Sequence, residues 1–267
     1  MTISLARRIE DTRGAAGGAA LWWLGQAGFA FKSGEGTVIY VDPYLSNVVE
    51  RMFGFKRLSL APIDAEAVRA DWVVSSHEHL DHLDTDALPI IAGNNPQCRF
   101  AGPVSCVEEY EKCGISMERR LILSPGSAYA LNDVMLHTTQ ADHGELSPSA
   151  LSLLLDFGKV RVLFTGDTAL RPAWMQPLID MKPTVLLPCI NGKYGNLSAI
   201  EAAQLTRTVN PKIVVPCHFW MFKEHNGDPE SFVQACAELC PGVQLNILTP
   251  GEGIVIDDDG AQPARSV

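Results

Sequence analysis

Short runs of hydrophobic residues alternate with glycine- and proline-containing turns along most of the chain. Near the N-terminus this pattern predicts three strands over residues 20–25, 29–33 and 37–42. A second strand-rich stretch covers residues 121–166, where Pro–Gly, Asn–Asp and Gly–Lys turns separate the apolar runs. After each stretch, single buried strands alternate with segments of helical pattern.

Helices are predicted where a capping residue or a proline opens a segment of helical pattern. Ser198 and Glu201 have the spacing of a capping box, so one helix is expected to begin there. The predicted helices are residues 64–70, 83–92, 103–113, 172–181, 198–209 and 228–240, and the buried strands among them are residues 71–75, 184–189 and 212–217. In each half of the chain, strands come first and a mixture of strands and helices follows. This order predicts an α/β fold. We expect two sheets packed face to face with helices outside, a four-layer αββα sandwich.

The domain organisation follows from what the sequence lacks. We find no repeat, no low-complexity tract and no convincing linker, so one domain is expected over residues 20–257. Residues 1–19 contain no continuous apolar stretch and are predicted to be a loose leader before the first strand. Residues 258–267 are predicted to be a polar tail.

Composition narrows the classes of partner. The chain has 267 residues, 46% of them hydrophobic, with a formal net charge of -10. This acidic balance argues against a nucleic-acid partner, although a local site can still bind a small anionic substrate. No apolar run approaches the roughly 20 residues of a membrane span. Seven scattered cysteines without an export signal predict reduced thiols and a cytoplasmic location. The sequence leaves open whether the chain forms a homo-oligomer.

One segment carries most of the chemical information. His77, His79, Asp81 and His82 fall within six residues, directly after the buried strand predicted at residues 71–75. His77 and His79 project to the same side of an extended chain, whereas Asp81 and His82 point elsewhere once the chain turns. Imidazole and carboxylate ligands suit zinc, iron and manganese. A solvated histidine-rich loop is the alternative interpretation, but this spacing after a strand favours a site for two neighbouring metals.

The segment HEHLDH, residues 77–82, resembles the HxHxDH signature of the metallo-β-lactamase superfamily. That family adds a later histidine, a bridging aspartate from a Gly–Asp turn and a final histidine. His143, Asp167 and His218 match these positions, and each follows a predicted strand. The resemblance implies that two divalent ions, manganese or zinc, share a hydroxide nucleophile. The implied ligands are His77, His79 and His143 for one ion, Asp81, His82 and His218 for the other, and Asp167 as the bridge.

The resemblance also implies that Asp81 and Asp167 are catalytic, with Asp81 orienting the nucleophile. His137 competes with His143 for one ligand position. Because His137 lies inside a predicted strand, we expect it to have a core or sheet-surface role. His225 lies in a predicted loop and is expected at the surface, with a role as proton donor left open.

Four further segments, residues 22–28, 41–44, 190–196 and 217–220, are similar to the L-ascorbate-6-phosphate lactonase family. That similarity implies a cytosolic, manganese-dependent enzyme that opens a sugar-acid lactone carrying an anionic group. Asn191, Lys193 and Tyr194 are the candidate substrate contacts, because they precede a helix N-terminus that favours anions. A glycine-rich turn with a solvated lysine is an equal alternative.

Two other functions remain open at this point. A phosphodiesterase or nuclease of the same fold would need a basic surface, and no basic cluster is visible. A non-hydrolytic metal-binding or diiron redox protein is the other, but diiron relatives typically have glutamate where this chain has His79. Phe53, Phe55, Lys56 and Arg57 belong to an irregular segment that forms a lid, a subunit contact or an ordinary packed loop.

Overall fold

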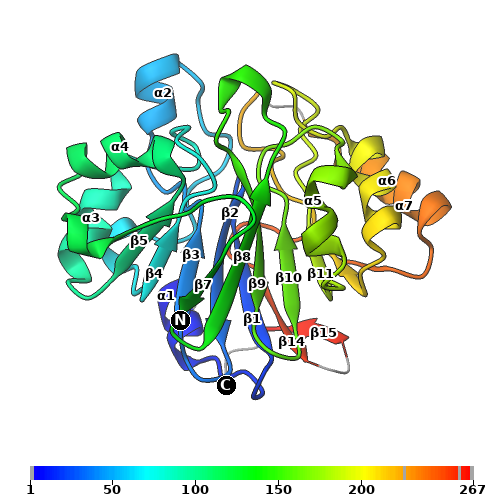
Figure 1. The fold of residues 1–267 in the computed structure, drawn as a ribbon, viewed down its shortest axis with the longest axis horizontal. Coiled ribbons are helices and arrows are strands. Elements are labelled where there is room, and N and C mark those ends of the chain that lie inside the picture. The colour runs from blue at the N-terminus through cyan, green and yellow to red at the C-terminus, as the bar shows by residue number, and fades with distance from the viewer. Residues whose placement is uncertain (1–2, 225–226, 258–259, 265–267) are drawn as a thin grey trace.

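Two mixed β-sheets pack face to face and carry helices on their outer faces (Figure 1). This computed structural model describes residues 3–224, 227–257 and 260–264. Within these ranges, the first sheet has eight strands in the order β15-β14-β1-β2-β3-β4-β5-β6, and the second has seven in the order β13-β12-β11-β10-β9-β8-β7. The predicted αββα sandwich is confirmed.

The strands are short, and most of their residues are buried. The first sheet comprises β1 (Ala19–Gly25), β2 (Gly28–Ser33), β3 (Val38–Val41), β4 (Trp72–Val74), β5 (Arg99–Gly102), β6 (Arg120–Ile122), β14 (Gly253–Asp257) and β15 (Gly260–Pro263). The second comprises β7 (Ala128–Leu131), β8 (Val134–Gln140), β9 (Leu151–Asp156), β10 (Arg161–Phe164), β11 (Val185–Leu187), β12 (Ile213–Val214) and β13 (Gln244–Leu245).

Each sheet changes from antiparallel to parallel pairing along its width. Strands β1 to β3 pair antiparallel, whereas β3 to β6 pair parallel. Likewise β7 to β10 pair antiparallel and β10 to β13 parallel. Parallel strands end at the same edge of a sheet, and loops at such an edge are the usual location of a ligand site.

Aromatic and aliphatic side chains from both sheets form the core between them. Phe29 from the first sheet meets Phe164 from the second edge to face, with ring centroids 6.3 Å apart. Trp23 stacks on Phe219 at 4.7 Å. These contacts fix the two sheets against each other at the end where the strands β4, β10 and β12 finish.

The helices cover both outer faces (Figure 1). They are α1 (Leu5–Asp11), α2 (Val48–Phe53), α3 (Ala87–Asn94), α4 (Val107–Lys112), α5 (Pro172–Ile179), α6 (Ala199–Val209) and α7 (Pro229–Leu239). Helix α6 begins at Ser198 with the predicted capping box, since Ser198 Oγ accepts from Glu201 N and the Glu201 carboxylate accepts from Ser198 N. None of the helices in the described ranges has the length and apolar character that a membrane crossing requires.

The predicted loose leader is wrong for residues 5–11, which form α1. Ser4 Oγ caps this helix at Arg7 N, and Leu5 and Ile9, one helical turn apart, are buried against the first sheet. The predicted polar tail is wrong for residues 260–263, which form β15 and pair antiparallel with β14. The rest of that tail and His225 lie outside the described residues.

Two predicted helices differ most from the structure. Residues 64–70 contain only a 3-10 turn at Ala65–Ala67, and residues 103–113 divide into a 3-10 turn at Val104–Cys106 followed by α4. In contrast, the segment predicted as irregular contains α2, which ends at Gly54 in the left-handed conformation. Short helices of this kind depend on tertiary contacts more than on local propensity.

Candidate metal centre

The seven predicted ligands come together from four loops that follow strands. Residues 77–82 follow β4, and the other loops follow β8, β10 and β12 and carry His143, Asp167 and His218. The ring centroids of His77 and His143 are 5.1 Å apart, and those of His82 and His218 are 5.4 Å apart. Residues as far apart as 77 and 218 therefore share one site.

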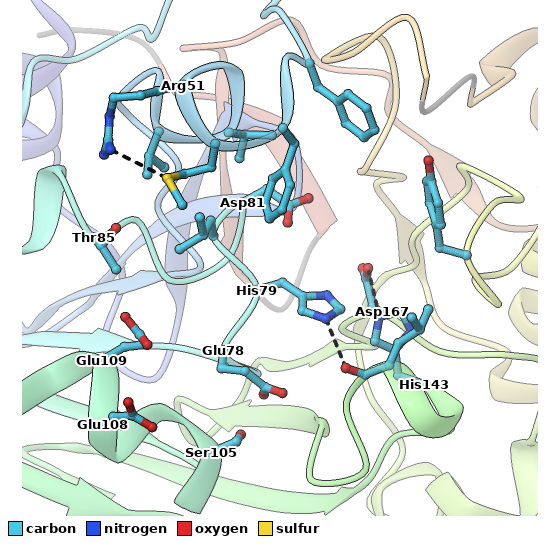
Figure 2. A pocket seen from close by; sticks show the side chains of 18 of the residues that line it. Arg51, Glu78, His79, Asp81, Thr85, Ser105, Glu108, Glu109, His143 and Asp167 are labelled. Atoms are coloured by element: carbon cyan, nitrogen blue, oxygen red, sulfur yellow. Dashed lines mark hydrogen bonds and ion pairs between the residues drawn. The ribbon is translucent and has the colours of Figure 1, made fainter. Parts of the chain in front are cut away.

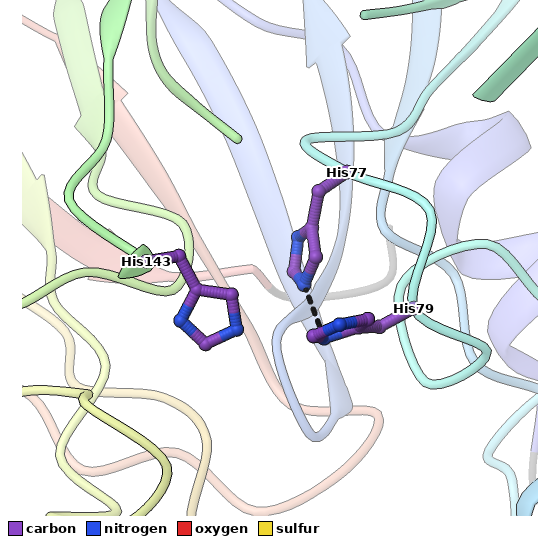
Figure 3. A group of neighbouring side chains, drawn as sticks. All are labelled: His77, His79 and His143. Carbon is purple, nitrogen blue, oxygen red and sulfur yellow. Dashed lines mark hydrogen bonds between the residues drawn. The ribbon is translucent and has the colours of Figure 1, made fainter. Parts of the chain in front are cut away.

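The first group contains three histidines. One nitrogen of each of His77, His79 and His143 lies within 4.8 Å of the others. His77 Nε2 and His79 Nδ1 are 3.0 Å apart, and Figure 3 shows His143 approaching from the opposite loop. Three imidazoles converging in this way form a usual ligand set for a divalent transition metal.

The second group contains one carboxylate and two histidines. Ligand atoms of Asp81, His82 and His218 also lie within 4.8 Å of one another. Asp81 Oδ2 is 3.7 Å from His82 Nε2 and 3.7 Å from His218 Nε2. This group therefore has the mixed nitrogen and oxygen character that manganese and zinc accept.

Asp167 lies between the two groups and presents one carboxylate oxygen to each. Its Oδ1 is 3.4 Å from His82 Nε2 and 3.3 Å from His218 Nε2. Its Oδ2 is 3.8 Å from His143 Nε2. This is the position from which one carboxylate can bridge two ions.

Buried polar atoms without partners test whether the residues fit a metal. Among the described residues, neither ring nitrogen of His143 has a hydrogen-bond partner, and neither does His82 Nε2. Buried polar groups are normally hydrogen-bonded, and leaving one unpaired costs about 1–3 kcal/mol. His143 Nε2 and His82 Nε2 both face the carboxylate of Asp167, at 3.8 Å and 3.4 Å, so the donor set fits divalent cations.

The electrostatics of the site favour neutral imidazoles at His77 and His143 beside an ionised Asp167. Burial lowers the pKa of His77 well below its usual value and also lowers the pKa of His143. Burial alone would raise the pKa of Asp167, but His218 and His82 hold that pKa well below its usual value. His82 differs, because burial lowers its pKa but the neighbouring carboxylates of Asp167, Asp81 and Asp42 raise that pKa well above its usual value. Neutral imidazole and carboxylate are the forms that bind metals.

Asp42 is a site residue that the ligand pattern does not include. Its Oδ2 accepts a hydrogen bond from His82 Nδ1 at 2.6 Å, and both its oxygens bond to Ser76, at the backbone N–H and at Oγ. The first bond leaves His82 Nε2 to face the cluster, as carboxylates commonly do for metal-binding histidines. The sequence offered one signal, an aspartate at the end of a predicted strand. In the structure β3 runs parallel to β4 with Val41 beside Val74, which brings Asp42 next to the start of the ligand loop.

Gln26 is a second such residue, in the turn between β1 and β2. Its Nε2 donates to Asp81 Oδ2 at 2.7 Å and lies 3.2 Å from His218 Nε2. The backbone N–H of His218 donates to Gln26 O at 2.7 Å. Gln26 and His218 both have left-handed backbone conformations, with φ of 51° and 61°. The turn thus holds two predicted ligands from different loops.

The structure separates the two competing histidines. His143 belongs to the first group, whereas His137 lies within β8, half-buried and paired with Ala128 on β7. Within the described residues, His137 belongs to no group of metal-binding side chains. The preference for His143 over His137 agrees with this geometry.

A cavity of about 860 Å³ opens over the cluster and is lined by His79, Asp81, His143 and Asp167 (Figure 2). Of the three predicted substrate contacts, Tyr194 lines this cavity. Asn191 is buried, and its Nδ2 donates to Lys193 O at 3.4 Å. Lys193 is exposed and is not among the residues that line the cavity.

A family model described as the β-lactamase superfamily domain matches residues 20–218, which include all seven predicted ligands. The chain belongs to this family. Relatives that the chain matches are named metal-dependent hydrolases, and the matches together support a metal-dependent hydrolase of the metallo-β-lactamase superfamily.

Named relatives of this superfamily hydrolase support the branch suggested by the sequence. A metal-dependent hydrolase of Aeropyrum pernix is 29% identical over 90% of this chain and 98% of its own length. A protein of Salmonella paratyphi B named probable L-ascorbate-6-phosphate lactonase UlaG is 26% identical, over 85% of this chain and 76% of its own length.

Solved structures share the fold of this hydrolase. Igni18, a metallo hydrolase from Ignicoccus hospitalis, has a TM-score of 0.69 and 24% identity, covering 90% of this chain and 99% of that chain. A protein from Veillonella parvula, described as a possible metal-dependent hydrolase, has a TM-score of 0.72 at 15% identity, covering 88% of this chain and 98% of that chain. At these identities the likeness concerns the fold alone.

Proposed function

We propose that this protein is a hydrolase with two divalent ions, manganese or zinc, that opens a lactone. The observation that carries the proposal is the position of Asp167, whose two oxygens face His82 and His143, one from each group of ligands. A carboxylate between two sets of buried ligands is the arrangement that a two-ion centre requires. The native metal is part of the proposal.

The proposed roles of the chain's own residues follow from their contacts. Asp81, held by Gln26 Nε2 at 2.7 Å, would orient the attacking water and accept its hydrogen bond. Asp42 would keep the ring of His82 in one orientation. When bound, the two ions would lower the pKa of that water and polarise the substrate's carbonyl oxygen.

The reaction itself is a simple hydrolysis. Water adds to the carbonyl carbon of the lactone, the bond between that carbon and the ring oxygen breaks, and the ring oxygen takes a proton. The product is an open hydroxy acid, and no oxidant or reductant is consumed. Tyr194, at the rim of the cavity, would contact the substrate.

The substrate, its charge and the location of the protein are inferred from the relatives and the sequence. The choice of a lactone rests on the resemblance to a probable L-ascorbate-6-phosphate lactonase. The anionic group, with Asn191 and Lys193 as its contacts, stays a prediction from the sequence. A cytoplasmic location is proposed because the seven cysteines are all free thiols.

A substrate screen with a matched pair of variants tests the proposal. Protein purified without chelator and loaded with manganese or zinc is given phosphorylated sugar lactones, plain lactones, phosphodiesters and single-stranded nucleic acid. We expect lactone opening that a chelator abolishes. Asp167→Ala should lower kcat/KM by about 100-fold or more, and Asp180→Ala, at an exposed carboxylate that follows the last residue of α5, should leave it unchanged. Turnover of phosphodiesters without any lactone would overturn the proposal.

A further inference from the structure

The cavity over the metal cluster has one wall of apolar side chains. Helix α2 contributes Met52 and Phe53, and Leu146 and Tyr194 come from other segments of the lining. Leu146 is adjacent to the predicted ligands, because its carbonyl oxygen is 3.1 Å from His79 Nε2. Leu146 therefore lies beside the site of reaction, in the same cavity as Met52 and Phe53.

These four side chains are unusually exposed for their size. The exposed fractions are 56% for Met52, 61% for Phe53, 52% for Leu146 and 49% for Tyr194. A single exposed hydrophobic residue is ordinary, but several around one cavity indicate a binding surface. Small-molecule sites are mostly apolar with a few polar groups that fix the ligand's orientation.

The charged side chains that line the cavity offer little to an anion. Arg51 Nη2 pairs with Asp86 Oδ1 at 2.6 Å. Lys112 Nζ pairs with Glu108 at 2.9 Å and with Glu109 at 2.7 Å. Outside the predicted ligands, the lining contains two basic side chains, Arg51 and Lys112, and three acidic ones, Glu78, Glu108 and Glu109.

The apolar wall is also firmly supported. The buried carboxylate of Asp84 accepts hydrogen bonds from Leu45 N at 2.8 Å, Ser46 N at 2.7 Å and Ser46 Oγ at 2.6 Å, directly before α2. After α2, Arg57 Nη1 donates to Ser46 O at 2.8 Å, and its guanidinium lies 4.5 Å from the ring centroid of Tyr44. Met52 and Phe53 are thus presented by a braced segment, so their exposure belongs to the folded state.

We propose that the substrate is an uncharged lactone or ester with an alkyl or aryl substituent, and that this substituent packs against Met52, Phe53 and Leu146. This inference rests on the proposed hydrolase function and names its substrate class. The carbonyl group lies at the metal cluster, and the apolar substituent extends along α2. A phosphorylated sugar lactone fits this cavity less well, because both lining cations are already paired with carboxylates.

Two measurements on the metal-loaded protein test the substrate class. The first is kcat/KM for γ-lactones whose substituent grows from methyl to hexyl, beside a phosphorylated sugar lactone. The second is calorimetric affinity for cyclopentanones with the same substituents, which cannot be hydrolysed. Each added methylene should raise kcat/KM and affinity about two- to fourfold until the wall is covered.

Variants connect this dependence to the wall. Phe53→Ser and Met52→Ser should each reduce affinity for the hexyl ketone about tenfold, with an effect on the methyl ketone below about twofold. Ile200→Ser is the matched control, because Ile200 is a 57% exposed residue on α6 outside the cavity lining. It should change neither affinity.

The outcomes separate this inference from the proposed function. Lactone turnover that is independent of chain length, or that is highest for the phosphorylated lactone and unaffected by Phe53→Ser, would overturn the apolar site and leave the hydrolase standing. Chain-length-dependent ketone binding without chelator-sensitive turnover of any lactone would support the apolar site and overturn the lactonase.

Discussion

At the scale of single residues, the centre depends on how each imidazole is turned. His82 directs Nε2 toward the cluster because Asp42 accepts from Nδ1, and the same carboxylate fixes Ser76 at the start of the ligand loop. One aspartate therefore holds both a ligand and the loop that carries it. Such indirect contacts commonly change metal affinity by about 10- to 100-fold.

Asp42→Ala tests this positioning role. The substitution removes the acceptor for His82 Nδ1, so affinity for one of the two ions should fall about 10- to 100-fold. Competition with a chelating dye measures that affinity, and circular dichroism checks that the fold is kept. Asp180→Ala is the control at an exposed carboxylate. Equal metal affinities for the two variants would show that Asp42 does not act through His82.

His143 and His137 give a second comparison between residues of one type. His143→Ala removes a nitrogen from the three-histidine group, so metal content measured by elemental analysis should drop to about half of the parent value. His137→Ala lies away from the cluster and should keep full metal content, with a loss of stability of about 1 kcal/mol. The reverse pattern would move the ligand assignment to β8.

The sequence predicted which side chains would gather at one site, but not what holds them there. His77 to His82 have a fixed spacing, and His143, Asp167 and His218 each follow a strand, so their pattern is local. Residues 22–28 and 41–44, which contain Gln26 and Asp42, stood out by similarity alone, without a role for either residue. Asp42 and Gln26 act through neighbours that are 40 and 55 residues away in sequence. Their roles depend on strand register and on one turn, which a linear pattern does not specify.

At the scale of elements, the ends of strands position the predicted ligands, and two short helices, α1 and α2, pack on the sandwich. Long periodic segments such as α6 were predicted within one residue of their bounds, because capping and burial agree there. Helices α1 and α2 have seven and six residues, too few to be stable alone. Tertiary contacts stabilise both: α1 packs on the first sheet through Leu5 and Ile9. Helix α2 packs through Val48 and Val49 in a separate cluster with Tyr44, Met221 and Phe222, and Asp84 bonds the segment before it.

Helix α1 offers a matched pair of isoleucines for testing its docking. Ile9 is 4% exposed within α1 and Ile3 is 42% exposed just before it. Ile9→Ala should lower the free energy of unfolding by about 2–4 kcal/mol, and Ile3→Ala by less than about 1 kcal/mol. Urea denaturation measures both. Equal small effects would mean that α1 adds little to the stability of the fold.

At the scale of the whole molecule, the metal centre lies across the junction of the two sheets. The first group takes His77 and His79 from a loop of the first sheet and His143 from the second. The second group likewise joins Asp81 and His82 to a histidine that follows β12. Bound ions would therefore connect the two halves of the sandwich as well as perform chemistry.

Metal removal tests this connection. Ions that bind only the folded state stabilise it by an amount that depends on their concentration, about 2.7 kcal/mol at 100 times Kd. Thermal unfolding of the chelator-treated protein should therefore begin at a lower temperature than that of the manganese-loaded protein. His218→Ala should show a smaller difference between the two forms. An unchanged midpoint after chelation would show that the ions do not link the halves.

The braced segment that carries α2 has a consequence for how this protein can diversify. It occupies the single connection between β3 and β4, whereas the predicted ligands lie in other loops. As long as Asp42, the first residue of this connection, is kept to hold His82, evolution can therefore alter the rest of the connection while the predicted ligands stay unchanged. A graft of this connection from one homologue into another would transfer selectivity for the alkyl or aryl substituent of the substrate. The acceptor would have to keep an aspartate at the position of Asp84 to anchor the graft.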